Sequence, residues 1–189
     1  MYFKLRVSHI TDLVGYDHIL FIIVLCAAYS LSQWKNILIL ITAFTVGHST
    51  TLVLALFNIV RIPGEIIEFL IPVTILLTSV ANILQKKDFV NACQHFFKYC
   101  MALFFGFIHG LGFSNYLRNL LGSESNLTKP LFAFNLGIEL GQLIIVAIIL
   151  LITALTIHLG HAKKREWNLI LSGAGIGVSL ILILERFPF

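Results

Sequence analysis

The sequence predicts an all-α, polytopic membrane protein with six transmembrane helices in one bundle. Of its 189 residues, 58% are hydrophobic and only 12% are charged, whereas a soluble domain carries about 25% charged residues. The hydrophobic residues lie in continuous runs, and a helix needs about 20 such residues to cross a bilayer. None of the runs shows the period-two alternation of a membrane β-strand. We therefore expect one integral membrane domain over residues 1–189, with spans near 14–32, 36–58, 66–84, 97–117, 131–155 and 169–184.

Short polar segments separate the first three spans. No cleavage site typical of a signal peptide precedes the span 14–32, so we expect this span to act as its own insertion signal. Arg61 followed by Pro63 and Gly64 predicts the turn after the second span. The polar stretch 85–95 then divides the chain into two halves of three spans each.

Turn residues and glycines organise the second half. The segments 122–130 and 158–167 are rich in turn-forming and charged residues, which predicts loops. Glycines at helical spacing predict close helix packing in the spans, at Gly106 and Gly110, Gly137 and Gly141, and Gly173, Gly175 and Gly177.

The spacing of the polar residues indicates an internal repeat. His18 precedes His48 by 30 residues, and His109 precedes Glu139 by the same interval. With three spans in each half, such a repeat would be a 3+3 inverted repeat, as in many transporters.

The basic residues are divided between the two sides of the membrane. An even number of spans puts both termini on one side, with six of the 13 Lys and Arg residues there and seven on the other. The clusters at 86–87 and 163–165 favour a cytoplasmic position for the third and fifth loops, and hence termini outside. Bases between spans commonly set orientation, so the net charge of +4 does not indicate nucleic-acid binding.

Polar residues interrupt the spans at four places. They form the segments 15–18 and 47–51, the single residue His109, and the set of Asn135, Glu139 and Gln142. An ionisable group at the centre of a bilayer costs about 2.5–3.5 kcal/mol or more, so such groups usually mark a pathway or a site. Imidazole and carboxylate groups are also metal ligands. No Lys or Arg falls within the core of a predicted span, so a metal ion or a proton is the expected partner of Glu139.

Helical geometry groups these residues further. Asp17 and His18 point about 100° apart on a helix, so one is expected to bind while the other orients it. His48 and Thr51 share a face, as do Asn135, Glu139 and Gln142. In each case a hydrogen bond between helices is the alternative. Upstream, His9 and Asp12 either extend the polar stripe of the first span or lie solvated at headgroup level.

Four segments together resemble the HupE/UreJ family of small nickel and cobalt permeases, especially its UreJ-like second branch: 15–21, 47–52, 105–113 and 134–142. The resemblance implies a bacterial inner-membrane protein. It also implies Asp17, His18, His48, His109 and Glu139 as the metal site, and we place His9, Asp12, Thr51, Asn135 and Gln142 around that site. Larger nickel/cobalt permeases carry a His five residues before an Asp-His pair. Here Asp12 occupies that position, and the nearest upstream histidine is His9.

Three functions fit these residues. The first is transport of a divalent transition-metal cation, nickel or cobalt, across the lipid bilayer, with binding that requires deprotonated ligands and therefore couples to pH. The second is a zinc-dependent intramembrane hydrolase, with Glu139 or Asp17 as general base. The third is a metal sensor, chaperone or accessory subunit of a complex. The sequence leaves the oligomeric state open.

Overall fold

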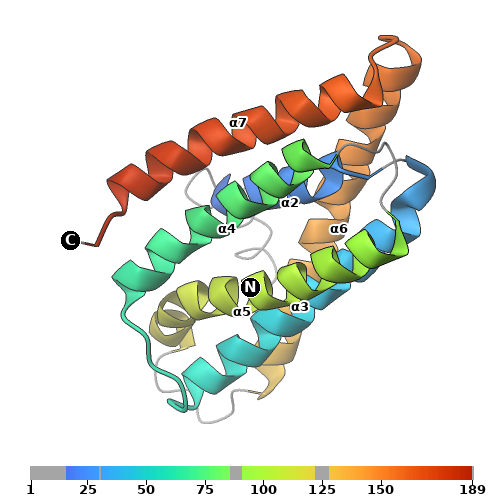
Figure 1. Cartoon of the computed structure of the whole chain (residues 1–189). Helices are drawn as coiled ribbons and strands as arrows, with labels where there is room; N and C mark the ends of the chain where they lie inside the picture. Colours follow the sequence, from blue (N-terminus) through green and yellow to red (C-terminus); the bar gives the residue numbers. More distant parts are fainter. Residues whose placement is uncertain (1–15, 30, 86–90, 122–127, 189) are drawn as a thin grey trace.

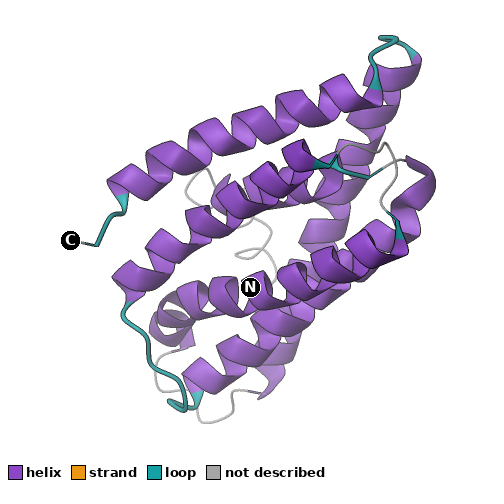
Figure 2. Ribbon diagram, in the orientation of Figure 1, coloured by secondary structure: helices purple, strands orange, loops and turns teal. Residues whose placement is uncertain are grey.

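A computed structural model describes residues 16–29, 31–85, 91–121 and 128–188, although not the side chains of 115–131 and 134. The described residues form six α-helices and one short 3-10 helix, with no strand among them (Figures 1 and 2). The helices are α2 (Tyr16–Ala27), α3 (Trp34–Leu56), α4 (Gly64–Leu84), α5 (Ala92–Leu121), α6 (Thr128–His158) and α7 (Lys164–Glu185), and η2 (Leu31–Gln33) precedes α3. The all-α prediction with six helices is confirmed.

Five of these helices are long and apolar enough to cross a membrane, and α2 is shorter. The described part of α2 has 12 residues, which at 1.5 Å per residue is about 18 Å, against about 30 Å for the hydrocarbon core. The first span was expected to reach residue 32, but α2 ends at Ala27. The Tyr29 N–H donates to the Cys26 carbonyl at 3.0 Å, and this tight turn ends the helix.

Parts of the predicted loops are helical. Helix α5 begins inside the predicted loop 85–95, because Asn91 and Gln94 exchange side-chain and backbone hydrogen bonds of 2.9 and 3.2 Å. This reciprocal pair is a capping box, which starts a helix from polar residues. Similarly, α6 begins at Thr128 and α7 at Lys164. At these places the helices begin within polar segments that hydropathy alone assigns to loops.

The bundle pairs α3 with α5 and α4 with α7, and α2 packs against α4, α6 and α7 (Figure 1). The hydrophobic core surrounds α2 and includes Phe21, Val24 and Leu25. Close approach of α3 to α5 depends on glycines, since a Cβ at Gly47 or Gly106 would overlap a backbone oxygen of the facing helix. The predicted packing role of Gly106 is therefore confirmed.

The glycines of α7 differ from the expectation. A Cβ at Gly175 would meet Ser79 of α4 and Val24 of α2, so this glycine does lie at a helix contact. Gly173 and Gly177 have nothing within 4 Å of a Cβ placed on them. The prediction that they pack against another helix is wrong, because they lie on the exposed face of α7.

Basic side chains define one end of the bundle. Arg165 donates to the Ile83 carbonyl at 2.6 Å, and Lys164 donates to the Ala28 carbonyl at 3.2 Å. Cations at helix C-termini offset the partial negative charge of the last carbonyl groups. We call this the Lys164 end of the bundle. The opposite end, where α7 stops and α4 starts, is the Arg186 end.

Candidate functional site

Three histidines from three different helices lie together inside the bundle. The ring centroid of His18 (α2) lies 4.8 Å from that of His109 (α5) and 6.4 Å from that of His48 (α3). His48 is 1% exposed and His109 is fully buried. Helix packing therefore brings together the three histidines among the predicted site residues. We call this set the histidine layer.

Asp17 holds the ring of His18. Its Oδ1 lies 3.0 Å from His18 Nδ1 and also accepts the His18 backbone N–H at 2.8 Å. An ionised carboxylate only accepts hydrogen bonds, so His18 Nδ1 carries the proton and Nε2 keeps its lone pair. A carboxylate behind a histidine is the usual arrangement around a metal ligand, since it fixes the tautomer and the ring orientation. This agrees with the expectation that one member of the pair orients the other.

Arg186 is the second partner of Asp17. Its Nη1 donates to Asp17 Oδ2 at 3.1 Å, which joins positions 169 residues apart in the chain. The expectation that no Lys or Arg neutralises the polar groups of the spans is therefore wrong at Asp17. A second basic side chain inside the bundle, Lys98 of α5, is only 8% exposed and donates to the neutral Asn82 Oδ1 at 2.6 Å.

Thr74 of α4 fixes the tautomer of His109. The Thr74 hydroxyl donates to the Ile71 carbonyl at 2.7 Å, so its oxygen accepts the proton of His109 Nε2, which lies 3.1 Å away. His109 Nδ1 then carries a lone pair. This atom and His48 Nδ1 are buried and have no hydrogen-bond partner within the described residues.

Sequence reasoning missed Thr74. The signal that indicates it is a polar stripe at four-residue spacing, because Thr74, Thr78 and Asn82 are all buried on one face of α4. Their side chains are neutral and short, so hydropathy treats them as ordinary members of an apolar span.

An aromatic layer lies directly beside the histidine layer, toward the Lys164 end. Phe21 follows His18 by three residues, and Phe44 and Phe105 each precede a site histidine by four. The ring centroid of Phe21 lies 5.0 Å from that of Phe44 and 6.2 Å from that of Phe105. Phe21 and Phe44 also contact His109, at 5.2 and 5.1 Å between centroids. Apolar rings therefore cover the histidines on the side that faces the Lys164 end.

Thr51, expected beside the site, has a structural role. Its hydroxyl donates to the Phe107 carbonyl of α5 at 2.8 Å, with the carbonyl oxygens of Gly47 and His48 at 3.2 and 3.3 Å. Such bonds to the preceding turn are common for Thr in helices. Thr51 therefore links the backbones of α3 and α5 and helps to hold His48 beside His109.

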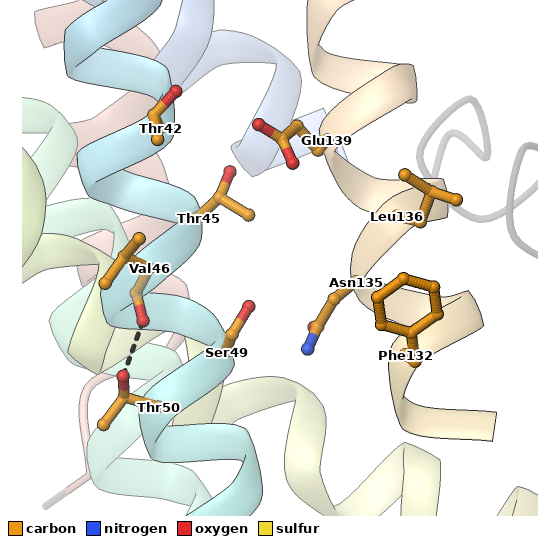
Figure 3. Close-up of a pocket in the computed structure, with 9 residues that line it drawn as sticks. All are labelled: Thr42, Thr45, Val46, Ser49, Thr50, Phe132, Asn135, Leu136 and Glu139. Atoms are coloured by element: carbon orange, nitrogen blue, oxygen red, sulfur yellow. Dashed lines mark hydrogen bonds between the residues drawn. The ribbon is translucent and has the colours of Figure 1, made fainter. Parts of the chain in front are cut away.

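Glu139 lies in a separate cavity between α3 and α6 (Figure 3). The cavity measures about 330 Å³ and is lined by Thr42, Thr45, Val46, Ser49, Thr50, Phe132, Asn135, Leu136 and Glu139. None of the three histidines lines it. Gln142, another residue expected beside the site, accepts a hydrogen bond from Thr45 at 3.0 Å. His9 and Asp12 lie outside the described residues.

The described side chains do not form an assembled metal site. In the described part of the chain, no group of three or more His, Cys, Asp or Glu side chains is close enough to hold one metal ion. The three described cysteines, Cys26, Cys93 and Cys100, are unpaired. What the histidine layer offers is three neighbouring imidazole groups, of which His18 is oriented by Asp17 and His109 by Thr74.

These features define a polytopic integral membrane protein with imidazole and carboxylate groups clustered inside its helix bundle. The chain belongs to the HupE/UreJ family: the profile of this family, described as HupE / UreJ protein, matches residues 1–185. This is a family of nickel and cobalt membrane permeases. Comparisons with curated proteins and with solved structures gave no match.

Proposed function

We propose that this chain carries nickel or cobalt ions across the membrane and that the histidine layer is the binding site on their path. The observation that carries the proposal is the pair of buried nitrogens, His48 Nδ1 and His109 Nδ1, which have no partner within the described residues. Leaving a buried polar atom unpaired costs about 1–3 kcal/mol. An ion that accepts their lone pairs would remove this cost.

The chemistry of the donors supports the choice of ion. Imidazole nitrogen suits nickel, copper, zinc and iron, whereas magnesium and calcium prefer oxygen ligands. His18 would bind through Nε2, because Asp17 occupies the other ring nitrogen. Membership of a nickel and cobalt permease family favours these two ions over the other transition metals.

The surroundings of the histidine layer support transport. Conduction requires a site that binds strongly enough for entry and weakly enough for release. The aromatic layer closes the path toward the Lys164 end. Toward the Arg186 end lies a cavity of about 450 Å³, lined by Glu65, Glu68, Glu185, Arg186, Phe187 and Pro188. Carboxylates at such a mouth attract cations.

The proposal is tested by uptake into liposomes. Purified protein reconstituted in lipid vesicles should accumulate ⁶³Ni²⁺ at a rate well above that of empty vesicles, and unlabelled Co²⁺ should compete. Excess Mg²⁺ should not compete, because it binds imidazole poorly. Failure to accumulate either metal, under conditions where the protein is folded and inserted, would overturn the proposal.

Replacing Arg186 with Gln should raise the rate of nickel uptake at low nickel concentrations. Arg186 pairs with one oxygen of Asp17. An arriving metal cation must therefore compete with the guanidinium group of Arg186 for this carboxylate. Without it, we expect the KM for nickel to fall by about three- to tenfold, where tenfold corresponds to about 1.4 kcal/mol. Lys163→Gln is the matched control, because it removes an exposed pair with Glu166 at the opposite end. A raised KM in R186Q would show that Arg186 assists binding instead.

A further inference from the structure

The cavity around Glu139 has features that the histidine layer does not use. Glu139 and Asn135 extend from α6 toward α3, and the hydroxyl groups of Thr45 and Ser49 extend toward them from α3 (Figure 3). The remaining polar residues that line the cavity, Thr42 and Thr50, also carry hydroxyl groups. Every atom that these side chains can offer to a cation is therefore an oxygen, because the amide nitrogen of Asn135 only donates hydrogen bonds.

Two of these groups lack partners. The Glu139 carboxylate makes no hydrogen bond or ion pair with any described residue, although it lies within a candidate membrane span. Asn135 Oδ1 is buried and likewise has no partner among the described residues. A carboxylate at membrane depth is costly unless a cation or a proton neutralises it. The side-chain oxygens of these two residues, one helical turn apart, are therefore available to a cation.

The chemistry of the donors indicates which cation. Oxygen ligands suit hard ions rather than the transition metals that imidazole binds. The lining of this cavity has one carboxylate, and a single positive charge balances it. A proton would need only one oxygen, whereas Thr45, Ser49 and Asn135 line the same cavity and offer further oxygens (Figure 3). The volume of about 330 Å³ leaves room for an ion that keeps some of its water.

The cavity is separated from the histidine layer by α3 itself. Thr45 and Ser49 face α6, while Phe44 and His48 face α2 and α5. The hydrogen bond from Thr45 to the buried Gln142 closes the side of the cavity nearest the core. A cation bound to Glu139 would therefore sit against the same helix that carries a site histidine, without sharing its ligands.

We infer that the Glu139 cavity is a second cation site, which binds sodium between α3 and α6. Its role as the coupling ion of transport rests on the proposed function, because a sodium ion that ties α6 to α3 would bias the position of the helix that carries His48. Binding of sodium itself does not depend on whether the chain transports nickel.

Direct binding of ²²Na⁺ tests the site. Purified protein should bind ²²Na⁺ saturably at constant ionic strength, with choline replacing sodium. Glu139→Gln should weaken binding at least tenfold, and the milder Ser49→Ala should weaken it severalfold. Glu166→Gln, which alters an exposed carboxylate at the Lys164 end, should leave binding unchanged. No saturable binding in the wild type, or equal binding in E139Q, would overturn the site.

Two further experiments distinguish this site from the metal site, and sodium from a proton as the coupling ion. His48→Ala should lose nickel binding and keep ²²Na⁺ binding, while E139Q should show the reverse. In liposomes, an imposed sodium gradient should raise ⁶³Ni²⁺ uptake severalfold at fixed pH. Uptake that follows a pH gradient and ignores sodium would overturn the coupling role. If neither variant nor wild type transports nickel, the binding measurement still decides whether sodium occupies the cavity.

Discussion

Replacing His109 with Ala should lower nickel uptake by about 100-fold or more. His109 is fully buried, is oriented by Thr74, and contacts His18. Loss of a group that only supports a metal ligand already costs about 10–100-fold, so loss of a ligand should cost at least the upper part of that range. The measurement is the initial rate of ⁶³Ni²⁺ uptake into liposomes at a concentration near the wild-type KM.

Two control variants test whether the loss of uptake comes from the loss of any histidine or from misfolding. His158→Ala removes an exposed histidine near the Lys164 end and should leave uptake unchanged. His109→Gln keeps a polar side chain of similar size, so it should fold like the wild type and still lose uptake. Uptake within about threefold of wild type in folded H109Q would contradict the role of His109.

Replacing Gly106 with Ala should strongly destabilise the protein. A Cβ at Gly106 would overlap the Phe44 carbonyl of α3 and lie 3.1 Å from the backbone nitrogen of His48. Both are backbone atoms, so the two helices must move apart. Overpacking of this kind costs about 1–3 kcal/mol, and sometimes more. At the upper value we expect the apparent Tm of the purified protein to fall by roughly 6–12 °C.

Gly173→Ala provides the matched control for that substitution. A Cβ at Gly173 meets nothing within 4 Å, and alanine has the higher intrinsic helix propensity, so Tm should stay the same or rise. G106A should also reduce nickel uptake, because separating α3 from α5 moves His48 away from His109. Equal Tm values for the two variants would contradict the close packing of α3 on α5.

The fold and the residue types of the site could be predicted because both depend on local properties. Long apolar runs specify membrane helices whatever their partners. Histidines and carboxylates in such runs are costly enough to stand out one residue at a time. Local geometry also led to the expectation that one of Asp17 and His18 orients the other, since adjacent residues on a helix diverge by about 100°.

The arrangement of the site could not be predicted, because it depends on how the helices rotate against one another. The pairing of Arg186 with Asp17 joins the two ends of the described chain, and no pattern near either residue indicates it. Glu139 shares a polar stripe with Gln142 on α6, yet α6 presents Glu139 to the outer face of α3. Likewise, Gly173 and Gly175 look alike in sequence, and only packing separates them.

Anomalous scattering at the nickel absorption edge, on protein purified without chelator and supplied with nickel, tests the central claim most directly. We expect a nickel peak within about 2.0–2.1 Å of ring nitrogens of the histidine layer, a typical metal–imidazole distance. His18 would contribute Nε2, and His48 and His109 would contribute Nδ1. A peak only at loop histidines or at Glu139, with the histidine layer unoccupied, would contradict it.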